Sequence, residues 1–431
     1  MTEQTERKRL DSLDAFRGFV IVSMLLVNAT WGEDQWGTGV VRSLAMQLAH
    51  VPWNDPTQGA TFTDLVFPWF LFIMGAAVPL SMRSGRGRGI PPARRILVAA
   101  RRAVVIYLFG VLLTHATSWL DRPASWTDLL SWNILQLIGA AYFVSVLVGM
   151  LPRKAWWAFV IGVLIAKWAL MLGIPADWAR GVLENGPVPL APRGDGAPTG
   201  FGTFTHFDDV KRLLNREHLS GAETPWARYL VGWLGMAQQW LPAAAIAMAG
   251  ALAVDTLTDH ARAARARAAR VAALGAGAIV IAFILSAGYD ASGGGLLGPL
   301  TVPMSKWFFS PAYCLMASGT AALLLAASFW VIDVRGLSWV ARPWRTFGVN
   351  ALALYIGAEM SYKLAFSRWK LELPSGSGNT LPGAVNAWVA HWLGGLPGSA
   401  VISGLAFAVL WIALWWLVCA WLDRNRIYFR V

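Results

Sequence analysis

A histidine and an aspartate at the start of a strongly apolar segment have the residue types for acid–base or nucleophilic chemistry. His50 and Asp64 lie in the stretch HVPWNDPTQGATFTDLVFPWFLFIMG. A carboxylate that holds one imidazole nitrogen leaves the other nitrogen as a base or nucleophile near neutral pH. Each residue also has a structural alternative. His50 can serve as an interfacial polar side chain, and Asp64 can be the third residue of a capping box that begins at Thr61.

Other polar side chains lie within or beside apolar segments and are candidates for the same site. Asn28 closes the first apolar segment, where it either caps a helix, bonds to another helix or donates to an oxyanion. Glu359 is costly in lipid, so we expect it to face protein or water, with a salt bridge to Lys363 as the structural alternative. The residues predicted to contact a substrate are Trp53, Asn54, Lys306, Tyr355 and Glu359.

The segments that carry these residues have the composition of membrane spans. Hydrophobic residues make up 56% of the 431-residue chain and charged residues only 14%, whereas a soluble domain carries about 25% charged residues. Several apolar runs reach the roughly 20 residues that a membrane helix needs. The sequence predicts an all-α integral membrane protein, a bundle of about ten transmembrane helices. Their ranges are 13–31, 62–82, 97–117, 130–151, 155–174, 229–254, 270–289, 309–331, 345–362 and 400–422.

The positive charges predict how these helices are oriented. The net charge is +12, and most of the 36 Lys and Arg residues fall on one side when the N-terminus is placed in the cytoplasm. We therefore expect both termini in the cytoplasm and His50 on the outer face. The excess charge is a topology signal, so no nucleic-acid partner is expected. The two cysteines lie in apolar runs and predict neither a disulfide framework nor a metal site.

We expect a single domain over residues 1–431 with two notable loops. An outer loop occupies about 175–228, and a basic cytoplasmic segment, DHARAARARAAR, occupies about 255–270. The alternation of Ala and Arg predicts a short helix on the membrane surface, held by anionic lipid headgroups. No internal repeat is visible, which disfavours the transporter architectures that are built from inverted repeats.

Cytoplasmic arginines are candidates for binding a phosphate-bearing ligand. Arg17 enters the first helix from that side, and Asp14, one turn earlier, is its expected neutralising partner. If Arg17 instead faces a cavity, its guanidinium is suited to phosphate oxygens. The residues predicted to bind the cofactor are Arg17, Arg101, Arg102, Gln136, Arg342, Arg345 and Asn350.

Six blocks of the chain resemble the heparan-alpha-glucosaminide N-acetyltransferase family of membrane enzymes. They are RLDSLDAFRGFVIVSMLLVN, HVPWN, TFTDLVFPWFLFIMGAAVPLSM, NILQLIGAAYFV, MSKWFFSPAYCLMASGTAALLLAASFWVIDVRG and FGVNALALYIGAE. The resemblance implies a bundle of ten or eleven helices that forms a homodimer, with His50 in the active site and Asn28 beside it. The long outer loop reads FDDVKRLLNREHLSGAETPWARYLVG where many members carry Asp-Pro-Glu-Gly. Candidate acceptor contacts in that loop are Asp208, Asp209, Glu217 and His218.

The function implied by this resemblance is acetyl transfer across a bacterial inner membrane. Acetyl-CoA would bind from the cytoplasm and its thioester would reach His50 on the periplasmic side, because moving the charged carrier through hydrocarbon is prohibitive. His50 would accept the acetyl group or deprotonate an amino-sugar or glycan acceptor, with Asn28 at the oxyanion and Asp64 orienting the imidazole. No metal is expected. The alternatives are a secondary transporter for a sugar or glycan fragment, with Glu359 among its proton-coupled sites, and an O-acyltransferase acting on an envelope polysaccharide.

Overall fold

A computed structural model of the chain confirms an all-α integral membrane protein. The described residues are 10–30, 36–51, 59–87, 89–130, 133–173, 225–289, 295–306, 309–366, 370–372, 378–396 and 398–428. Within these ranges eight helices are long and apolar enough to cross a membrane: Asp11–Ala29, Phe62–Ser84, Pro92–His115, Arg153–Leu172, Gln239–Leu257, Ala264–Ser286, Pro311–Val334 and Ser399–Arg424. The apolar helix Ile134–Gly149 is shorter. Trp53, Asn54 and the four acceptor candidates of the long outer loop lie outside the described residues.

The chain divides into two compact units, and the first contains Met1–Ala45, Thr256–Leu274 and Ala321–Val431. In this unit α1 (Asp11–Ala29) packs against α12 (Ser338–Gly348) and α15 (Ser399–Arg424). A Cβ at Gly18 would lie 1.7 Å from the carbonyl oxygen of Trp344, and one at Gly348 would lie 2.1 Å from that of Asp14. Glycine on both helices is therefore what lets the two backbones touch.

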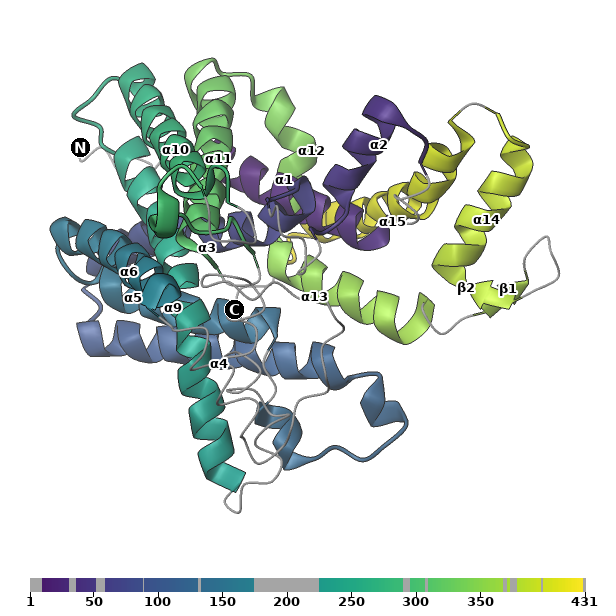
Figure 1. Ribbon diagram of the computed structural model, residues 1–431, viewed down its shortest axis with the longest axis horizontal. Coiled ribbons are helices and arrows are strands. Elements are labelled where there is room, and N and C mark those ends of the chain that lie inside the picture. The colour runs from purple at the N-terminus through teal and green to yellow at the C-terminus, as the bar shows by residue number, and fades with distance from the viewer. Residues whose placement is uncertain are drawn as a thin grey trace. The chain divides into compact units, whose positions relative to one another are not determined.

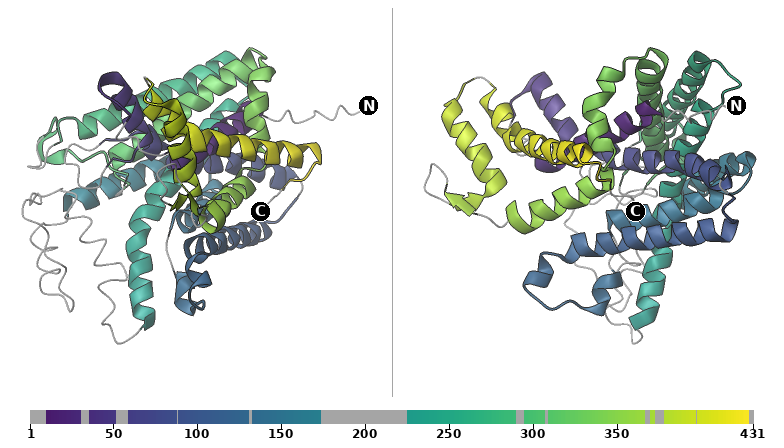
Figure 2. Two further views of the ribbon diagram at one scale, coloured as in Figure 1. Left: turned by 90° about the vertical axis from the view of Figure 1, so that its right-hand side faces the viewer. Right: turned by 180° about the vertical axis from the view of Figure 1, so that it is seen from behind.

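The C-terminal part of this unit adds elements that the apolar pattern did not predict. The helix α14 (Leu381–Leu393) lies beside α15 in every view (Figure 1, Figure 2). A short antiparallel pair, β1 (Lys370–Glu372) and β2 (Gly378–Thr380), precedes α14.

Near the N-terminus of the same unit, the short α2 (Gly39–Ala45) follows α1 along the chain.

Two predicted segments differ from the structure. The predicted span 345–362 is two helices, because α12 ends at Gly348 and α13 (Ala351–Ser361) begins after the buried Asn350. The Asn350 side chain donates to the carbonyl oxygen of Ile427 at 3.0 Å and so anchors the break. The basic segment is not a separate helix: residues 264–270 form the first turns of α10 (Ala264–Ser286). Both Ala and Arg favour helix, so the basic turns continue directly into the apolar span.

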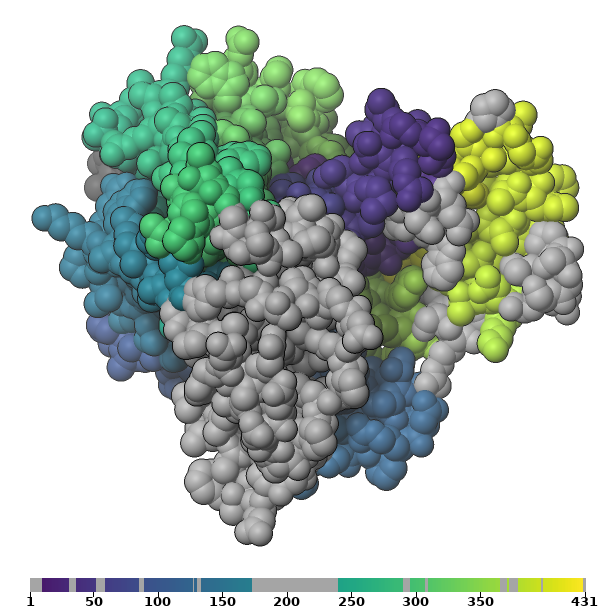
Figure 3. Space-filling model, in the orientation of Figure 1, coloured from purple at the N-terminus to yellow at the C-terminus, as the bar shows by residue number. Residues whose placement is uncertain are grey.

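The second unit, Met46–Asp255 and Gly275–Thr320, is built around α3 (Phe62–Gly87). α3 packs against α5 (Ile134–Gly149) and approaches α9 (Pro225–Leu257) closely, since a Cβ at Gly75 would lie 1.8 Å from the carbonyl oxygen of Ala247. The spans of α3 and α9 are 72% and 78% buried, whereas that of α6 (Arg153–Gly173) is only 17% buried. Much of α6 is exposed on this unit (Figure 3), as expected for a helix that faces lipid.

Two further helices belong wholly or partly to this unit. α4 (Pro92–His115) runs alongside α5, and α11 (Pro311–Phe329) ends in a π turn, Trp330–Val334, that belongs to the first unit. Short 3₁₀ helices occupy Met46–Leu48, Ser118–Leu120, Trp126–Leu130 and Gly298–Leu300. Another π turn, Tyr362–Phe366, extends α13 in the first unit.

Candidate active site

Asp64 caps the N-terminus of α3 through one of its two carboxylate oxygens. The helix begins at Phe62, so Thr61 is the N-cap residue and Asp64 is the third residue of the helix. The Asp64 N–H donates to Thr61 Oγ1 at 3.4 Å, and the Thr61 N–H donates back to Asp64 Oδ2 at 3.4 Å. The Val51 N–H donates to the same Oδ2 at 3.1 Å. The capping box predicted from sequence is therefore present.

The other oxygen of Asp64 holds the histidine. His50 Nδ1 lies 2.8 Å from Asp64 Oδ1, and the ammonium of Lys306 lies 3.4 Å from the same oxygen. The Asp64 side chain is 2% exposed, whereas that of His50 is 50% exposed. The two alternatives for Asp64 thus coexist, because one oxygen caps the helix while the other contacts an imidazole that a substrate can reach.

The contacts of His50 Nδ1 indicate where its proton lies. Nδ1 is 2.8 Å from Asp64 Oδ1 and 3.1 Å from Lys306 Nζ. A ring nitrogen that donates to a carboxylate cannot also accept from an ammonium, and the shorter contact is to the carboxylate. We therefore assign the Nδ1 hydrogen to the bond with Asp64, an assignment that follows from the network. In the neutral imidazole Nε2 is then the basic nitrogen.

Lys306 places a cation beside this pair. Its side chain is 19% exposed, and burial lowers the pKa of Lys306 below its usual value, while the charge of Asp64 opposes that shift. The ammonium and the carboxylate together are neutral. The histidine thus lies beside a balanced ion pair rather than beside an isolated buried charge, which would be costly.

Hydrogen bonds on both sides of Asp64 fix the segment that carries His50. The hydroxyl of Thr61 donates to the carbonyl oxygen of Ala49 at 2.7 Å, and that of Thr63 donates to the carbonyl oxygen of Gln47 at 3.1 Å. On the other side, the fully buried hydroxyl of Tyr313 donates to the carbonyl oxygen of Asp64 at 2.6 Å. The first turn of α3 is therefore tied to α11 and to the chain just before His50.

In the first unit, Asn28 and Glu359 form a second polar pair. Asn28 Nδ2 donates to Glu359 Oε1 at 2.7 Å and joins α1 to α13. The backbone cap of α1 falls at Thr30, so Asn28 makes an interhelical bond rather than a C-cap. Tyr355 lies one turn before Glu359 on α13 and is half-buried.

The residues predicted to bind the cofactor belong to both units and differ in their contacts and exposure. Arg17 Nη1 lies 3.0 Å from Asp14, which confirms the expected pairing, and Arg345 lies 3.7 Å from Asp11. Gln136 is fully buried between α5 and α4, where a Cβ at Gly110 would lie 2.3 Å from its Oε1. The Asn350 side chain donates to the carbonyl oxygen of Ile427. The remaining members are the exposed Arg101 and Arg342 and the half-buried Arg102.

Comparison with known proteins confirms the predicted resemblance. The human heparan-alpha-glucosaminide N-acetyltransferase is 27% identical over 391 residues, which cover 84% of this chain and 55% of the human protein. The mouse protein of the same name is also 27% identical, over 86% of this chain and 56% of its own length. This chain is similar to those acetyltransferases. It spans about half the length of the curated relatives it matches. A family described as "Domain of unknown function (DUF5009)" matches residues 9–176.

Two residues of the His50 environment were not predicted to be there from the sequence. Lys306 was predicted only as a substrate contact, and the structure places it against His50 and Asp64. Tyr313 was not singled out at all. Both lie in MSKWFFSPAYCL, one of the blocks that resemble the acetyltransferase family. A lysine just before an apolar span was the available signal, but only the fold brings it to a histidine 256 residues away.

Proposed function

We propose that this protein is a transmembrane acetyltransferase that uses His50 to move an acetyl group from acetyl-CoA to an amino sugar or a related glycan. The observation that carries the proposal is the half-exposed imidazole held at 2.8 Å by a buried carboxylate. A similarity to N-acetyltransferases along 84% of the chain supports the reaction class. We further propose a multi-pass homodimer in a bacterial inner membrane, with His50 toward the periplasm.

The geometry suits either of two routes. In the covalent route His50 Nε2 attacks the thioester carbonyl, the C–S bond breaks, and the acceptor amine then displaces the imidazole from the acetyl group. In the direct route Nε2 removes a proton from the amine as the amine attacks the thioester carbonyl, and the C–S bond breaks to release coenzyme A. Both routes place positive charge on the imidazole, and Asp64 Oδ1 is positioned to stabilise it through Nδ1–H.

The residues proposed for the donor differ in how well they fit it. The exposed guanidiniums of Arg101 and Arg342 have the charge and the donor geometry for phosphate oxygens. Gln136 and Asn350 fit a packing role better, because the first is buried between helices and the second holds the break before α13. The acetyl donor supplies an activated thioester, and the Asn28 amide, oriented by Glu359, is proposed to donate to the oxyanion.

Transfer of labelled acetyl groups by purified protein tests the proposal. We expect labelled N-acetylglucosamine to form from labelled acetyl-CoA and glucosamine, and His50→Ala to lower the rate by about 10³-fold or more. His391→Ala removes an exposed histidine of α14 and is the matched control. Label that stays on denatured wild-type protein and is absent from His50→Ala indicates the covalent route.

The results that contradict the proposal are equally specific. Transfer by His50→Ala at the wild-type rate would remove the histidine from the mechanism. Accumulation of sugar in proteoliposomes, with no acetyl transfer to amino sugar or polysaccharide, would favour a transporter. Transfer to hydroxyl groups of a polysaccharide, but not to amines, would retain the donor and change the acceptor.

A further inference from the structure

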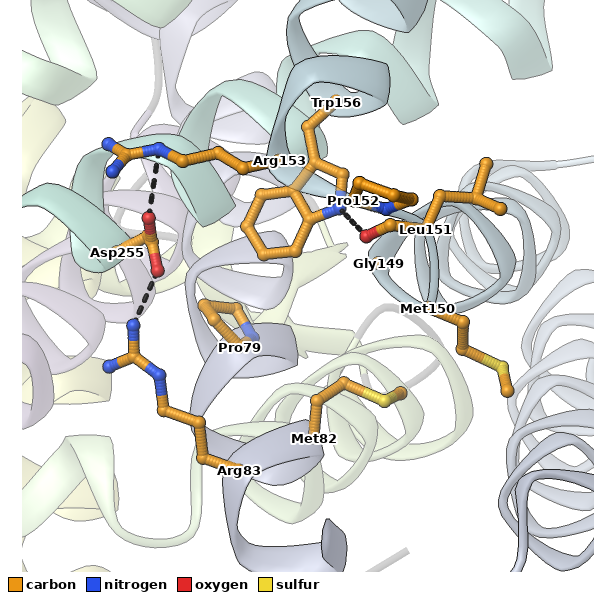
Figure 4. Close-up of a pocket in the computed structure, with 10 residues that line it drawn as sticks. All are labelled: Pro79, Met82, Arg83, Gly149, Met150, Leu151, Pro152, Arg153, Trp156 and Asp255. Carbon is orange, nitrogen blue, oxygen red and sulfur yellow. Dashed lines mark hydrogen bonds and ion pairs between the residues drawn. The ribbon is translucent and has the colours of Figure 1, made fainter.

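A cavity of about 430 Å³ lies in the second unit, among the ends of α3, α5 and α9 and the start of α6. Arg83, Arg153 and Asp255 line one side of it, and Met82, Met150 and Trp156 line much of the rest (Figure 4). The volume is within the range of roughly 300–1,000 Å³ that is usual for small-molecule sites. A charged wall facing an apolar one suits a ligand with both kinds of group.

The charged wall has a net positive charge. Asp255 lies between two guanidiniums, with Arg83 paired to its Oδ1 and Arg153 Nε 3.1 Å from its Oδ2. The aspartate is 14% exposed, while the two arginine side chains are 42% and 47% exposed. One carboxylate therefore contacts two guanidiniums, and these three lining side chains together carry a formal charge of +1. A pair of fixed guanidiniums is the arrangement that recognises phosphate oxygens.

A third arginine adds to this charge from behind the apolar wall. Arg95 Nη1 lies 3.9 Å from Met82 Sδ, and Met82 lines the cavity. Arg95 Nε is buried and has no hydrogen-bond partner among the residues that the structure describes. Three guanidiniums against one carboxylate make this end of the unit attractive to an anion.

The cavity lies at the opposite end of α3 from His50. Arg83 follows Asp64 by nineteen residues on the same helix, a distance of roughly 28 Å at the rise of an α-helix. That length is close to the ~30 Å hydrocarbon core of a bilayer. The arginines and Trp156 are thus at the depth of a membrane–water boundary, where such residues are common.

We propose that this cavity binds a phosphate ester, with the phosphate between Arg83 and Arg153 and the apolar part of the ligand against Met82, Met150 and Trp156. The headgroup of an anionic phospholipid and a soluble phosphate ester share this chemistry. The site stands independently of acetyl transfer, because none of its residues takes part in the His50 network.

Binding of defined probes to the purified full-length protein distinguishes the two sources. The probes are short-chain phosphatidylglycerol, the same lipid with a phosphatidylcholine headgroup, and adenosine 3′,5′-bisphosphate, each titrated while the thermal unfolding midpoint is followed. We expect phosphatidylglycerol, the bisphosphate or both to raise the midpoint. Arg153→Gln should weaken that binding about tenfold or more, since a charge-assisted hydrogen bond is lost. Lys154→Gln, which removes the adjacent exposed charge outside the cavity lining, should leave it within about twofold.

Asp255→Asn separates a ligand site from a purely structural ion pair. Without its carboxylate the two guanidiniums repel each other, so the unfolding midpoint should fall, and a bound phosphate should restore more stability than in the wild type. The proposal is overturned if none of the probes binds, if Arg153→Gln binds them as the wild type does, or if Asp255→Asn gains no extra stabilisation. If Arg153→Gln does not fold, Arg153→Lys, which keeps the positive charge, replaces it in the binding measurements.

Discussion

Among the described residues of the second unit are two His–Asp pairs, and they differ in what the carboxylate does. His50 Nδ1 lies 2.8 Å from Asp64, and the imidazole is 50% exposed. His115 Nδ1 lies 3.8 Å from Asp128, beyond hydrogen-bond distance, and its side chain is 13% exposed and stacked on Trp119. The same two residue types thus produce an accessible, oriented imidazole at one place and an enclosed one at the other.

The difference lies in how the other donors are divided between the two carboxylate oxygens. Arg122 donates to both oxygens of Asp128, at 2.8 and 3.0 Å, while Trp119 Nε1 and the Ser125 N–H also bond to Oδ2. These bonds tie the hairpin between α4 and α5 and leave no short bond for His115. Asp64 instead uses Oδ2 for the helix cap and leaves Oδ1 for His50 and Lys306. A neighbouring carboxylate is therefore not enough to orient an imidazole. One carboxylate oxygen must also be available for a short hydrogen bond to the ring.

The largest contrast is expected from replacing each aspartate by asparagine. Asp64→Asn keeps an oxygen for the cap but loses the charge that fixes the tautomer of His50, so kcat for acetyl transfer should fall by about 10²–10⁴-fold. Asp128→Asn should leave kcat within a few-fold and lower the thermal unfolding midpoint instead. Rate assays and thermal unfolding on both variants make the comparison. Equal losses of kcat would show that the two pairs do not differ in the proposed way.

Replacing Lys306 tests the cation that lies against both members of the His50 pair. Lys306→Gln leaves the buried Asp64 without its ammonium, so we expect kcat to fall about tenfold at neutral pH. Because burial lowers the pKa of Lys306, the wild type should lose rate at an alkaline pH below the usual pKa of lysine. The variant, which has no ammonium to lose, should lack that decline. An alkaline decline of the same shape in both proteins would assign it to another group.

The sequence predicted the membrane fold and the cap at Asp64 because both follow from local patterns, and it offered the His50–Asp64 pairing as one alternative for these two residues. Apolar runs mark the spans, and the Thr61–Asp64 spacing marks a cap. It could not predict that Asp64 would divide its two oxygens, since that depends on the path of the chain from Gln47 to Val51. Nor could it place Lys306 or Tyr313, whose contacts with the pair arise from packing of α11 and the loop before it.

The break before α13 escaped prediction for a different reason. The stretch FGVNALALYIG is apolar enough to continue a helix, and hydropathy alone gives no sign of the interruption. The interruption depends on Asn350 reaching the carbonyl oxygen of Ile427, 77 residues away. The glycines at helix contacts could not be interpreted from the sequence either. The need for glycine at Gly18 and Gly75 follows only from the neighbouring backbone that each one contacts.

Thr61→Ala isolates the capping half of Asp64. The change removes the hydroxyl that accepts from the Asp64 N–H and donates to Ala49, so stability should fall by about 1 kcal/mol. The charge of Asp64 and its bond to His50 remain, so kcat should change only a few-fold. Thr346→Ala, which removes a hydroxyl that donates to the carbonyl oxygen of Arg342 within α12, is the control in unfolding measurements. A collapse of kcat in Thr61→Ala would mean that cap and imidazole contact cannot be separated.

The smallest effect concerns acid stability at the Asp128 pair. The Arg122 guanidinium, helped by the Ser125 N–H and Trp119, holds the pKa of Asp128 well below its usual range. Asp128 in the unfolded chain protonates near pH 3.9, while in the folded protein it stays charged to lower pH. Between those values the unfolded state binds more protons, so the stabilisation is complete above about pH 5 and is lost as the pH falls.

Amide exchange over residues 116–130 should therefore accelerate as the pH falls through 4, beyond the intrinsic change. Arg122→Gln should exchange faster at neutral pH and show a weaker acid response. An acid response unchanged by Arg122→Gln would assign the acid-sensitive bond to another group.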